Sequence, residues 1–155
     1  MNKYNNKTNT NLYLGTIILN TSENDKSLVV DGQQRMTTIF ILLVAIRNYL
    51  QSILSSPEKN FDKDKVSSLK GQLTNIQPLI ASSDIALGTS ERATLEASPL
   101  IKETIDKMAD HQWRPPFDKN LCGYREVEAI YNFFEKMINQ DIKIEHLGSF
   151  LTALY

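Results

Sequence analysis

The sequence lacks several features that would define a function at once. Its single cysteine, Cys122, excludes an intramolecular disulfide and suits a reducing compartment. The formal net charge of −1 at pH 7 provides no excess of positive charge for nucleic acid or an anionic membrane. No Ser-His-Asp set, P-loop or HNH-like histidine pattern occurs. We therefore expect DNA to be contacted only indirectly, through a larger assembly.

Long apolar segments are also missing. The longest wholly apolar run is Ile39–Ile46, well short of the roughly 18–20 residues that span a bilayer. The first residues are rich in asparagine rather than basic and then apolar, so they do not resemble a secretion signal. We expect a soluble, cytoplasmic protein with no membrane partner.

Residues with metal-binding or reactive side chains are few. His111 and His146 are the only histidines, and neither has a cysteine or histidine at ligand spacing, so no metal site is expected on them. Cys122 lacks an activating pattern and is expected to be a buried, unreactive thiol. Trp113, beside Arg114 and two prolines, is expected to hold a loop against the core.

The sequence pattern predicts a predominantly helical α+β domain. Residues 1–11 contain five asparagines and no periodicity, and are expected to be a disordered tail. Residues 12–19 and 28–30 are predicted strands that form a hairpin. A long helix is predicted over about 33–54, followed by a helical remainder to residue 155, with 124–139 as its clearest helix.

Apolar residues on every side of the long helix predict that its first half is buried nearly all round and that it packs across a small sheet. Its second half becomes amphipathic, and Arg47 and Asn48 are expected to point outward. The middle of the chain is weakly patterned. There, Gly71 and Pro78 are expected to interrupt a second helix.

The corner between the second strand and the long helix reads Asp-Gly-Gln-Gln-Arg, residues 31–35. One interpretation is purely structural. Asp31 serves as the N-cap, Gln34 completes a capping-box-like pair, and Gly32 allows the sharp turn. Arg35 then pairs with Asp31 four residues earlier. Spacing alone favours this interpretation about as strongly as a functional one.

The functional interpretation starts from the unpaired N–H groups and the positive dipole at the start of a helix, which attract anions. The Arg35 guanidinium adds a fork that phosphate accepts, and the amides of Gln33 and Gln34 can read a sugar or a base edge. Thr37 and Thr38 add hydroxyls one turn further on.

Asp31 would repel a bare phosphate at this corner. A divalent cation between the two removes that conflict, and Mg²⁺ commonly binds one or two carboxylates together with substrate phosphates. A nucleoside triphosphate with Mg²⁺ therefore reconciles the charges of the corner better than a bare phosphate. The cap and the nucleotide site both remain open at this point.

The same residues carry a family resemblance. The segment YLGTIIL, a polar loop, and then LVVDGQQRMTTIFILLVAI resemble the N-terminal domain of GmrSD-type restriction endonucleases, which the Asp-Gly-Gln-Gln-Arg motif marks. That family is related in fold to ParB and sulfiredoxin, in which a Gly-x-x-Arg corner binds nucleotide phosphates. The resemblance implies a small ParB-like sheet beside the long helix. It also implies triphosphate binding and hydrolysis coupled to cleavage of modified phage DNA.

The resemblance implies a role for each residue of the motif. The residues that would act in hydrolysis are Asp31, Gln33 and Gln34, with Asp31 also as the Mg²⁺ partner. The residues that would hold the nucleotide are Gly32, Arg35, Thr37 and Thr38.

The chain also departs from the family pattern. A Tyr-Gln-Arg element and a tryptophan are missing before the Leu-Gly strand, and neither an Asn-x-x-Gly element nor a nuclease domain follows. We expect an internal piece of the family, residues 12–155, with a partner chain supplying the missing segments. The sequence therefore leaves two hypotheses, a nucleotide-binding fragment of a restriction protein and a non-enzymatic helical module that docks on other restriction chains.

Overall fold

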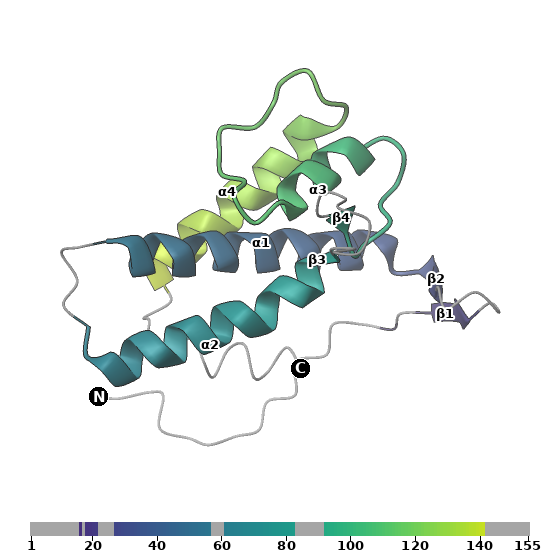
Figure 1. Ribbon diagram of the computed structural model, residues 1–155. Coiled ribbons are helices and arrows are strands. Elements are labelled where there is room, and N and C mark those ends of the chain that lie inside the picture. Colours follow the sequence, from purple (N-terminus) through teal and green to yellow (C-terminus); the bar gives the residue numbers. More distant parts are fainter. Residues whose placement is uncertain (1–15, 17, 22–26, 57–60, 83–91, 142–155) are drawn as a thin grey trace, which may run out of the picture.

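The computed structural model describes residues 16, 18–21, 27–56, 61–82 and 92–141 (Figure 1). The predicted tail at 1–11, most of the first predicted strand and the end of the chain after residue 141, His146 included, lie outside the described residues. The elements, in chain order, are β1 (Ile18–Thr21), β2 (Ser27–Asp31), α1 (Gln33–Ser55), α2 (Lys63–Ile80), β3 (Ala81–Ser82), β4 (Arg92–Ala93), α3 (Lys102–Ala109) and α4 (Tyr124–Asp141).

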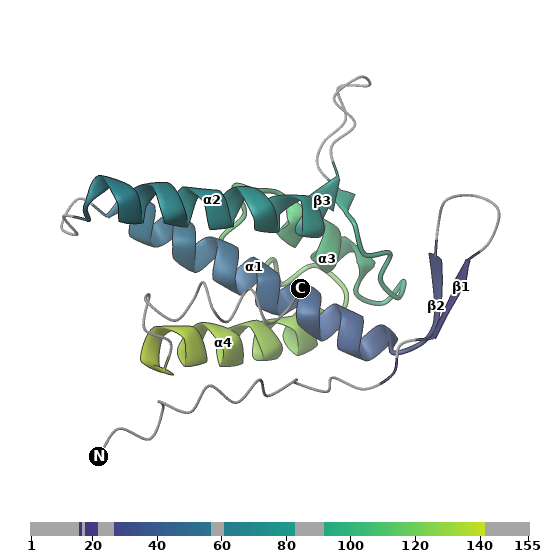
Figure 2. The same ribbon diagram turned by 90° about the horizontal axis from the view of Figure 1, so that it is seen from below.

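Helix α1 is the centre of the fold. It lies between α2 and α4, which pack along its two sides (Figure 2). Residues 40–48 are buried without interruption, so the expectation of a helix enclosed nearly all round in its first half is confirmed. Among the described residues, α1 alone is long and apolar enough to cross a membrane, but most of it is buried, as in the core helix of a globular domain. The absence of a membrane partner stays a prediction.

The described strands form two separate two-stranded sheets rather than one ParB-like sheet. β1 and β2 pair antiparallel, as predicted, with an irregular register between Ile18 and Leu19. This hairpin extends from the start of α1 (Figure 2). The expectation that α1 packs across the sheet is wrong, because its apolar faces are covered mainly by α2 and α4.

Helix α2 is continuous, and the expected breaks at Gly71 and Pro78 are wrong. Gly71 is exposed and costs the helix only about 1 kcal/mol relative to alanine. Pro78 lies in the last turn, between Ile76 and Ile80, which are both fully buried. Burial of these isoleucines against the core offsets the hydrogen bond that proline cannot make.

Helix α4 presents the predicted apolar face, with Val127, Tyr131 and Ile138 almost fully buried. The Tyr131 ring meets Trp113 and Phe117 edge-on, with centroids 5.5 and 5.6 Å away. Trp113 therefore holds the loop between α3 and α4 against the core, as predicted. Cys122, in the same loop, is exposed, so the expectation of a buried thiol is wrong.

Candidate functional site

The Asp-Gly-Gln-Gln-Arg corner joins β2 directly to α1. Asp31 is the last residue of β2, and Gly32 is the N-cap residue of α1 with φ 97° and ψ 11°, a left-handed conformation that favours glycine. The expectation that Asp31 is the N-cap is therefore wrong by one residue, because the glycine makes the turn itself. The Asp31 side chain lies outside what the structure describes, so its role with Mg²⁺ stays a prediction.

A cavity of about 450 Å³ opens beside this corner. Three parts of the chain surround it: the first turns of α1, the segment between β4 and α3, and the first turns of α4. The residues that line it are Gln33, Gln34, Thr37, Ile41, Leu95, Glu96, Ala97, Ser98, Ile101, Glu126, Val127 and Ile130. The cavity thus brings the start of α1 together with segments that lie more than fifty residues further along the chain.

The lining of the cavity is divided by polarity. Ile41, Ala97 and Val127 are buried and give it an apolar floor. Gln33, Gln34, Glu96, Ser98 and Glu126 are exposed and form a polar rim. An apolar body with a few convergent polar groups is the usual form of a small-molecule site.

The motif residues do not all face this cavity. Gln33, Gln34 and Thr37 line it, whereas Arg35 and Thr38 do not. The Arg35 guanidinium donates a hydrogen bond to the backbone carbonyl of Thr16, which ties the chain before β1 to the start of α1. The Thr38 hydroxyl donates to the Gln34 carbonyl over 2.8 Å, within the helix.

The rim carries negative rather than positive charge. Among its described lining residues are Glu96 and Glu126 but no lysine or arginine. Arg125, next to Glu126, is held by Tyr124, whose hydroxyl accepts from the Arg125 Nε over 3.2 Å. That bond is the main reason why the pKa of Arg125 is raised, and the charge of Glu126 adds to it. Nothing in the sequence pairs either glutamate with the corner, so sequence reasoning missed both.

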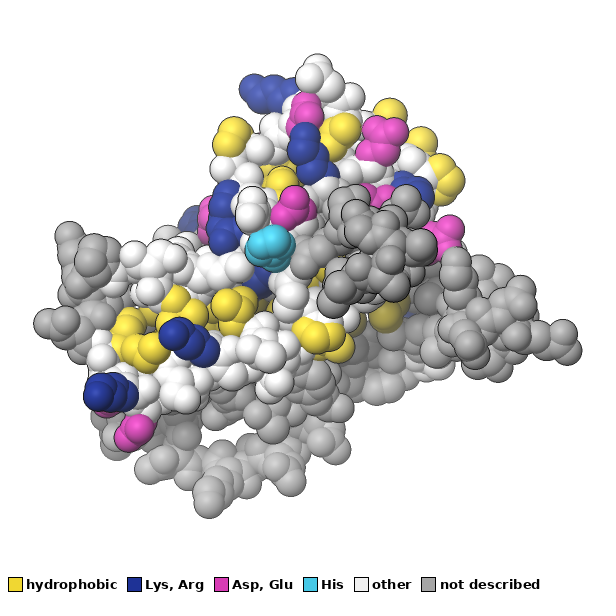
Figure 3. Space-filling view, viewed as in Figure 1, with side chains coloured by type: hydrophobic (Ala, Val, Ile, Leu, Met, Phe, Trp, Pro, Cys, Tyr) yellow, Lys and Arg dark blue, Asp and Glu magenta, His cyan; other side chains and the backbone are white. Residues whose placement is uncertain are grey.

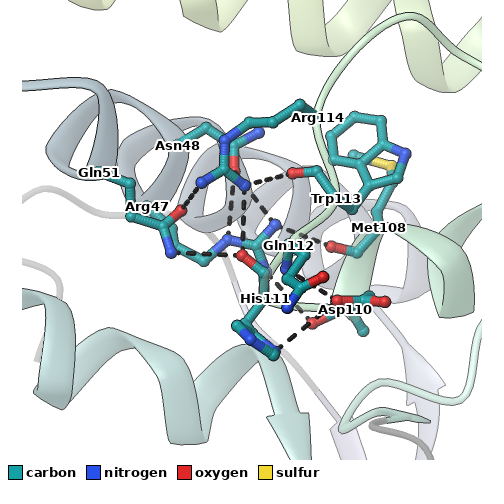
Figure 4. Close-up of polar contacts among 10 residues, drawn as sticks. Arg47, Asn48, Gln51, Met108, Asp110, His111, Gln112, Trp113 and Arg114 are labelled. Atoms are coloured by element: carbon teal, nitrogen blue, oxygen red, sulfur yellow. Dashed lines mark hydrogen bonds and ion pairs between the residues drawn. The ribbon is translucent and has the colours of Figure 1, made fainter. Parts of the chain in front are cut away.

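A second polar cluster lies further along α1 (Figure 4). Arg47 is fully buried, and its guanidinium donates to the carbonyls of Met108 and Ala109 over 3.1 and 3.2 Å. Asn48 is almost fully buried, and its amide nitrogen donates to the Tyr131 hydroxyl over 3.0 Å. The expectation that Arg47 and Asn48 point outward is wrong, because they satisfy the last carbonyls of α3 and a buried tyrosine.

Arg114 completes this second cluster from the loop after α3. Its guanidinium donates to the side-chain oxygens of Asn48 and Gln51 and to the His111 carbonyl (Figure 4). A small cavity of about 150 Å³ lies beside it. These hydrogen bonds use the Arg114 guanidinium and hold the loop after α3 against α1. We assign this cluster to stability rather than to ligand binding.

Comparison with known proteins agrees with the family resemblance. The family model of the GmrSD restriction endonuclease N-terminal domain matches residues 2–148. The chain belongs to this family. A search of curated proteins found no match, and a search of solved structures found none. As a GmrSD N-terminal domain, the chain is part of a DNA restriction system and hence of phage defence.

Proposed function

We propose that this GmrSD N-terminal domain binds a nucleoside triphosphate with Mg²⁺ in the cavity at the start of α1. One observation carries the proposal: the motif residues Gln33, Gln34 and Thr37 line a cavity of about 450 Å³. This volume falls within the roughly 300–1,000 Å³ typical of small-molecule sites. Side-chain amides both donate and accept hydrogen bonds, as recognition of a sugar and base requires.

The phosphates would lie at the first turn of α1, where backbone N–H groups and the helix dipole favour negative charge. Arg35, already at this end of the helix, would add its guanidinium. No group of three metal-binding side chains occurs in the described part of the chain. Mg²⁺ needs no such group, because it takes one or two carboxylates and completes its shell with phosphates and water. Asp31 is our candidate carboxylate.

Hydrolysis of the triphosphate is the second part of the proposal. Gln33 or Gln34 would orient the attacking water, and the bound cation would offset the charge on the transferred phosphoryl group. Contact with DNA would then come through a larger assembly.

Blocking the cavity tests where the nucleotide binds. Ser98 is exposed on the rim, so Ser98→Trp should fill the opening without disturbing the core. Ser67→Trp, on the exposed side of α2 and away from the cavity, is the matched control. Isothermal titration with triphosphate and Mg²⁺ should show binding to wild type and the control, and at least tenfold weaker binding to Ser98→Trp. Equal binding to all three proteins would place the nucleotide elsewhere.

Removing Arg35 tests the phosphate end of the site. Arg35→Ala should abolish triphosphate binding without unfolding the chain, whereas Arg125→Ala on α4 should bind like wild type. Since Arg35 also bonds to the Thr16 carbonyl, circular dichroism should be recorded beside each titration. Equal affinity of wild type and Arg35→Ala would remove Arg35 from the site.

Exposed apolar side chains favour the second hypothesis, a non-enzymatic docking module. Leu100 is 72% exposed, and Phe133, on α4, is 63% exposed. A docking module should form concentration-dependent oligomers in light scattering and show no response to nucleotide. A monomer that triphosphate stabilises would exclude this alternative.

A further inference from the structure

The small cavity beside the Arg114 cluster is a second place where a ligand fits. It lies between α1 and α4, and the loop after α3 adds Arg114 and Pro115 to its lining. None of the motif residues lines it, so it is separate from the cavity at the start of α1. Its volume is about 150 Å³. A cavity of roughly this volume takes one molecule of the size of benzene.

Tyr131 gives this cavity a buried hydroxyl group whose proton has no acceptor among the described residues. The Asn48 side-chain oxygen already accepts from Arg47 and Arg114 (Figure 4). The Asn48 nitrogen therefore faces Tyr131, and it donates to the Tyr131 oxygen over 3.0 Å. Since this is the one hydrogen bond that Tyr131 makes within the described chain, its own proton is left for another acceptor.

The Tyr131 hydroxyl stays a donor at neutral pH. Burial raises the pKa of Tyr131, and the nearby negative charge of Glu135 raises it further. The Tyr131 side chain is almost fully buried and lines the cavity, so an acceptor for its proton has to come from inside the cavity. A buried donor without an acceptor is unfavourable, and a ligand oxygen placed there would satisfy it.

The opposite requirement holds at the rim of the cavity. Glu135 follows Tyr131 by one turn of α4, lines the same cavity and is exposed. An ionised carboxylate only accepts hydrogen bonds, so it needs a donor. Between the two groups, Ala45 and Ile138 provide buried apolar walls. The cavity thus combines a donor at its floor, an acceptor at its rim and apolar sides.

We propose that this cavity binds a small primary amide, with the carbonyl oxygen toward the Tyr131 hydroxyl and the NH₂ group toward Glu135. A primary amide carries an acceptor and two donors on one carbon atom, which matches both groups. A ketone of the same shape satisfies Tyr131 but brings no donor to Glu135. A carboxylate of the same shape places a second negative charge beside Glu135.

Three ligands with the same branched skeleton test the proposal on the full chain. These are isobutyramide, methyl isopropyl ketone and isobutyrate. NMR titration, followed at the Ala45 methyl group, should show that isobutyramide binds about tenfold more tightly than the ketone, because hydrogen bonds to a charged group are the stronger ones. Isobutyrate should bind more weakly than either. Equal affinities for the three ligands would overturn the proposal, and so would the absence of any shift with isobutyramide.

Variants show which residues are responsible. Glu135→Leu, at an exposed position, should lower the affinity for isobutyramide to that for the ketone, whereas Glu128→Leu, on α4 outside the cavity lining, should keep the preference. Tyr131→Phe keeps the ring and should weaken the amide and the ketone alike by about fivefold. Because Glu135 is exposed, its variant remains a valid test even where Tyr131→Phe does not fold. An unchanged preference in Glu135→Leu would overturn the proposal.

Discussion

Arg47 shows how much of this fold depends on single polar side chains. Its guanidinium is fully buried in α1 and bonds to the carbonyls of Met108 and Ala109 at the end of α3. The last carbonyls of a helix lack partners within it, and a cation there also complements the helix dipole. One side chain thus fixes the end of α3 to the central helix.

Replacing Arg47 should therefore destabilise the whole domain. Arg47→Met keeps an apolar stem of similar length and leaves two buried carbonyls unsatisfied, at an expected cost of about 3 kcal/mol in the free energy of unfolding. Urea denaturation followed by circular dichroism measures this cost. Arg125→Met, at an exposed site on α4, is the control and should change stability by less than about 0.5 kcal/mol. Similar midpoints for the two variants would contradict the role assigned to Arg47.

Replacing Gly123 or Gly71 with alanine should change the stability of the domain in opposite directions. Gly123, with φ 66°, precedes α4, and an added Cβ would lie 2.5 Å from Ile101 Cγ2 and 2.7 Å from the Leu100 carbonyl oxygen. Gly71, inside α2, has nothing within 4 Å of that position. Gly123→Ala should lower stability by about 1–3 kcal/mol, and Gly71→Ala should raise it by about 0.5–1 kcal/mol. Thermal melts of both variants should shift in opposite directions, and shifts in the same direction would contradict the argument.

At the scale of whole elements, the start of α2 depends on a side-chain cap. The Asp62 carboxylate accepts a hydrogen bond from the Lys65 backbone N–H over 2.7 Å. Asp62→Ala should therefore cost about 1 kcal/mol of stability, as for other N-cap residues. Asp64→Ala, in the first turn of the same helix, removes only a favourable charge and should cost a few tenths of that. Equal urea midpoints for the two variants would show that the cap contributes nothing.

The helices α1 and α4 and the strand β2 could be predicted because their patterns are local. Apolar residues at helical spacing fix the extent of α1 and α4 whatever the rest of the chain does. The continuity of α2 could not be predicted, since tertiary burial of Ile76 and Ile80 outweighs the local effect of Pro78.

The candidate site could be predicted only in part, because it combines a local motif with residues that only tertiary packing brings near it. The motif predicts the turn at Gly32 and the polar residues beside it. Nothing in the sequence shows that Glu96 and Glu126 approach the motif, because that contact depends on how α4 and the segment before α3 pack on α1. The burial of Arg47 likewise depends on the end of α3, about sixty residues away.

At the scale of the whole molecule, the described part of the domain places its candidate site at one end of the central helix. On the face shown in Figure 3, positive and negative side chains are mixed over α3 and α4 and form no patch of one sign. This agrees with the formal net charge of −1. The cluster around Arg47 and Arg114 lies further along α1. Its hydrogen bonds hold the end of α3 and the loop after α3 against α1.

The central claim, that this restriction-system domain has a nucleotide site at the start of α1, is tested most directly by thermal melts. Wild type and Ser98→Trp should be melted with Mg²⁺, with and without GTP, ATP, UTP and CTP. A nucleotide at a hundred times its dissociation constant should stabilise wild type by about 2.7 kcal/mol, which raises the melting temperature by about 5–10 °C. We predict a Mg²⁺-dependent rise in wild type that Ser98→Trp loses. No rise in a cooperatively folded wild-type protein would contradict the claim and leave the motif as the turn that starts α1.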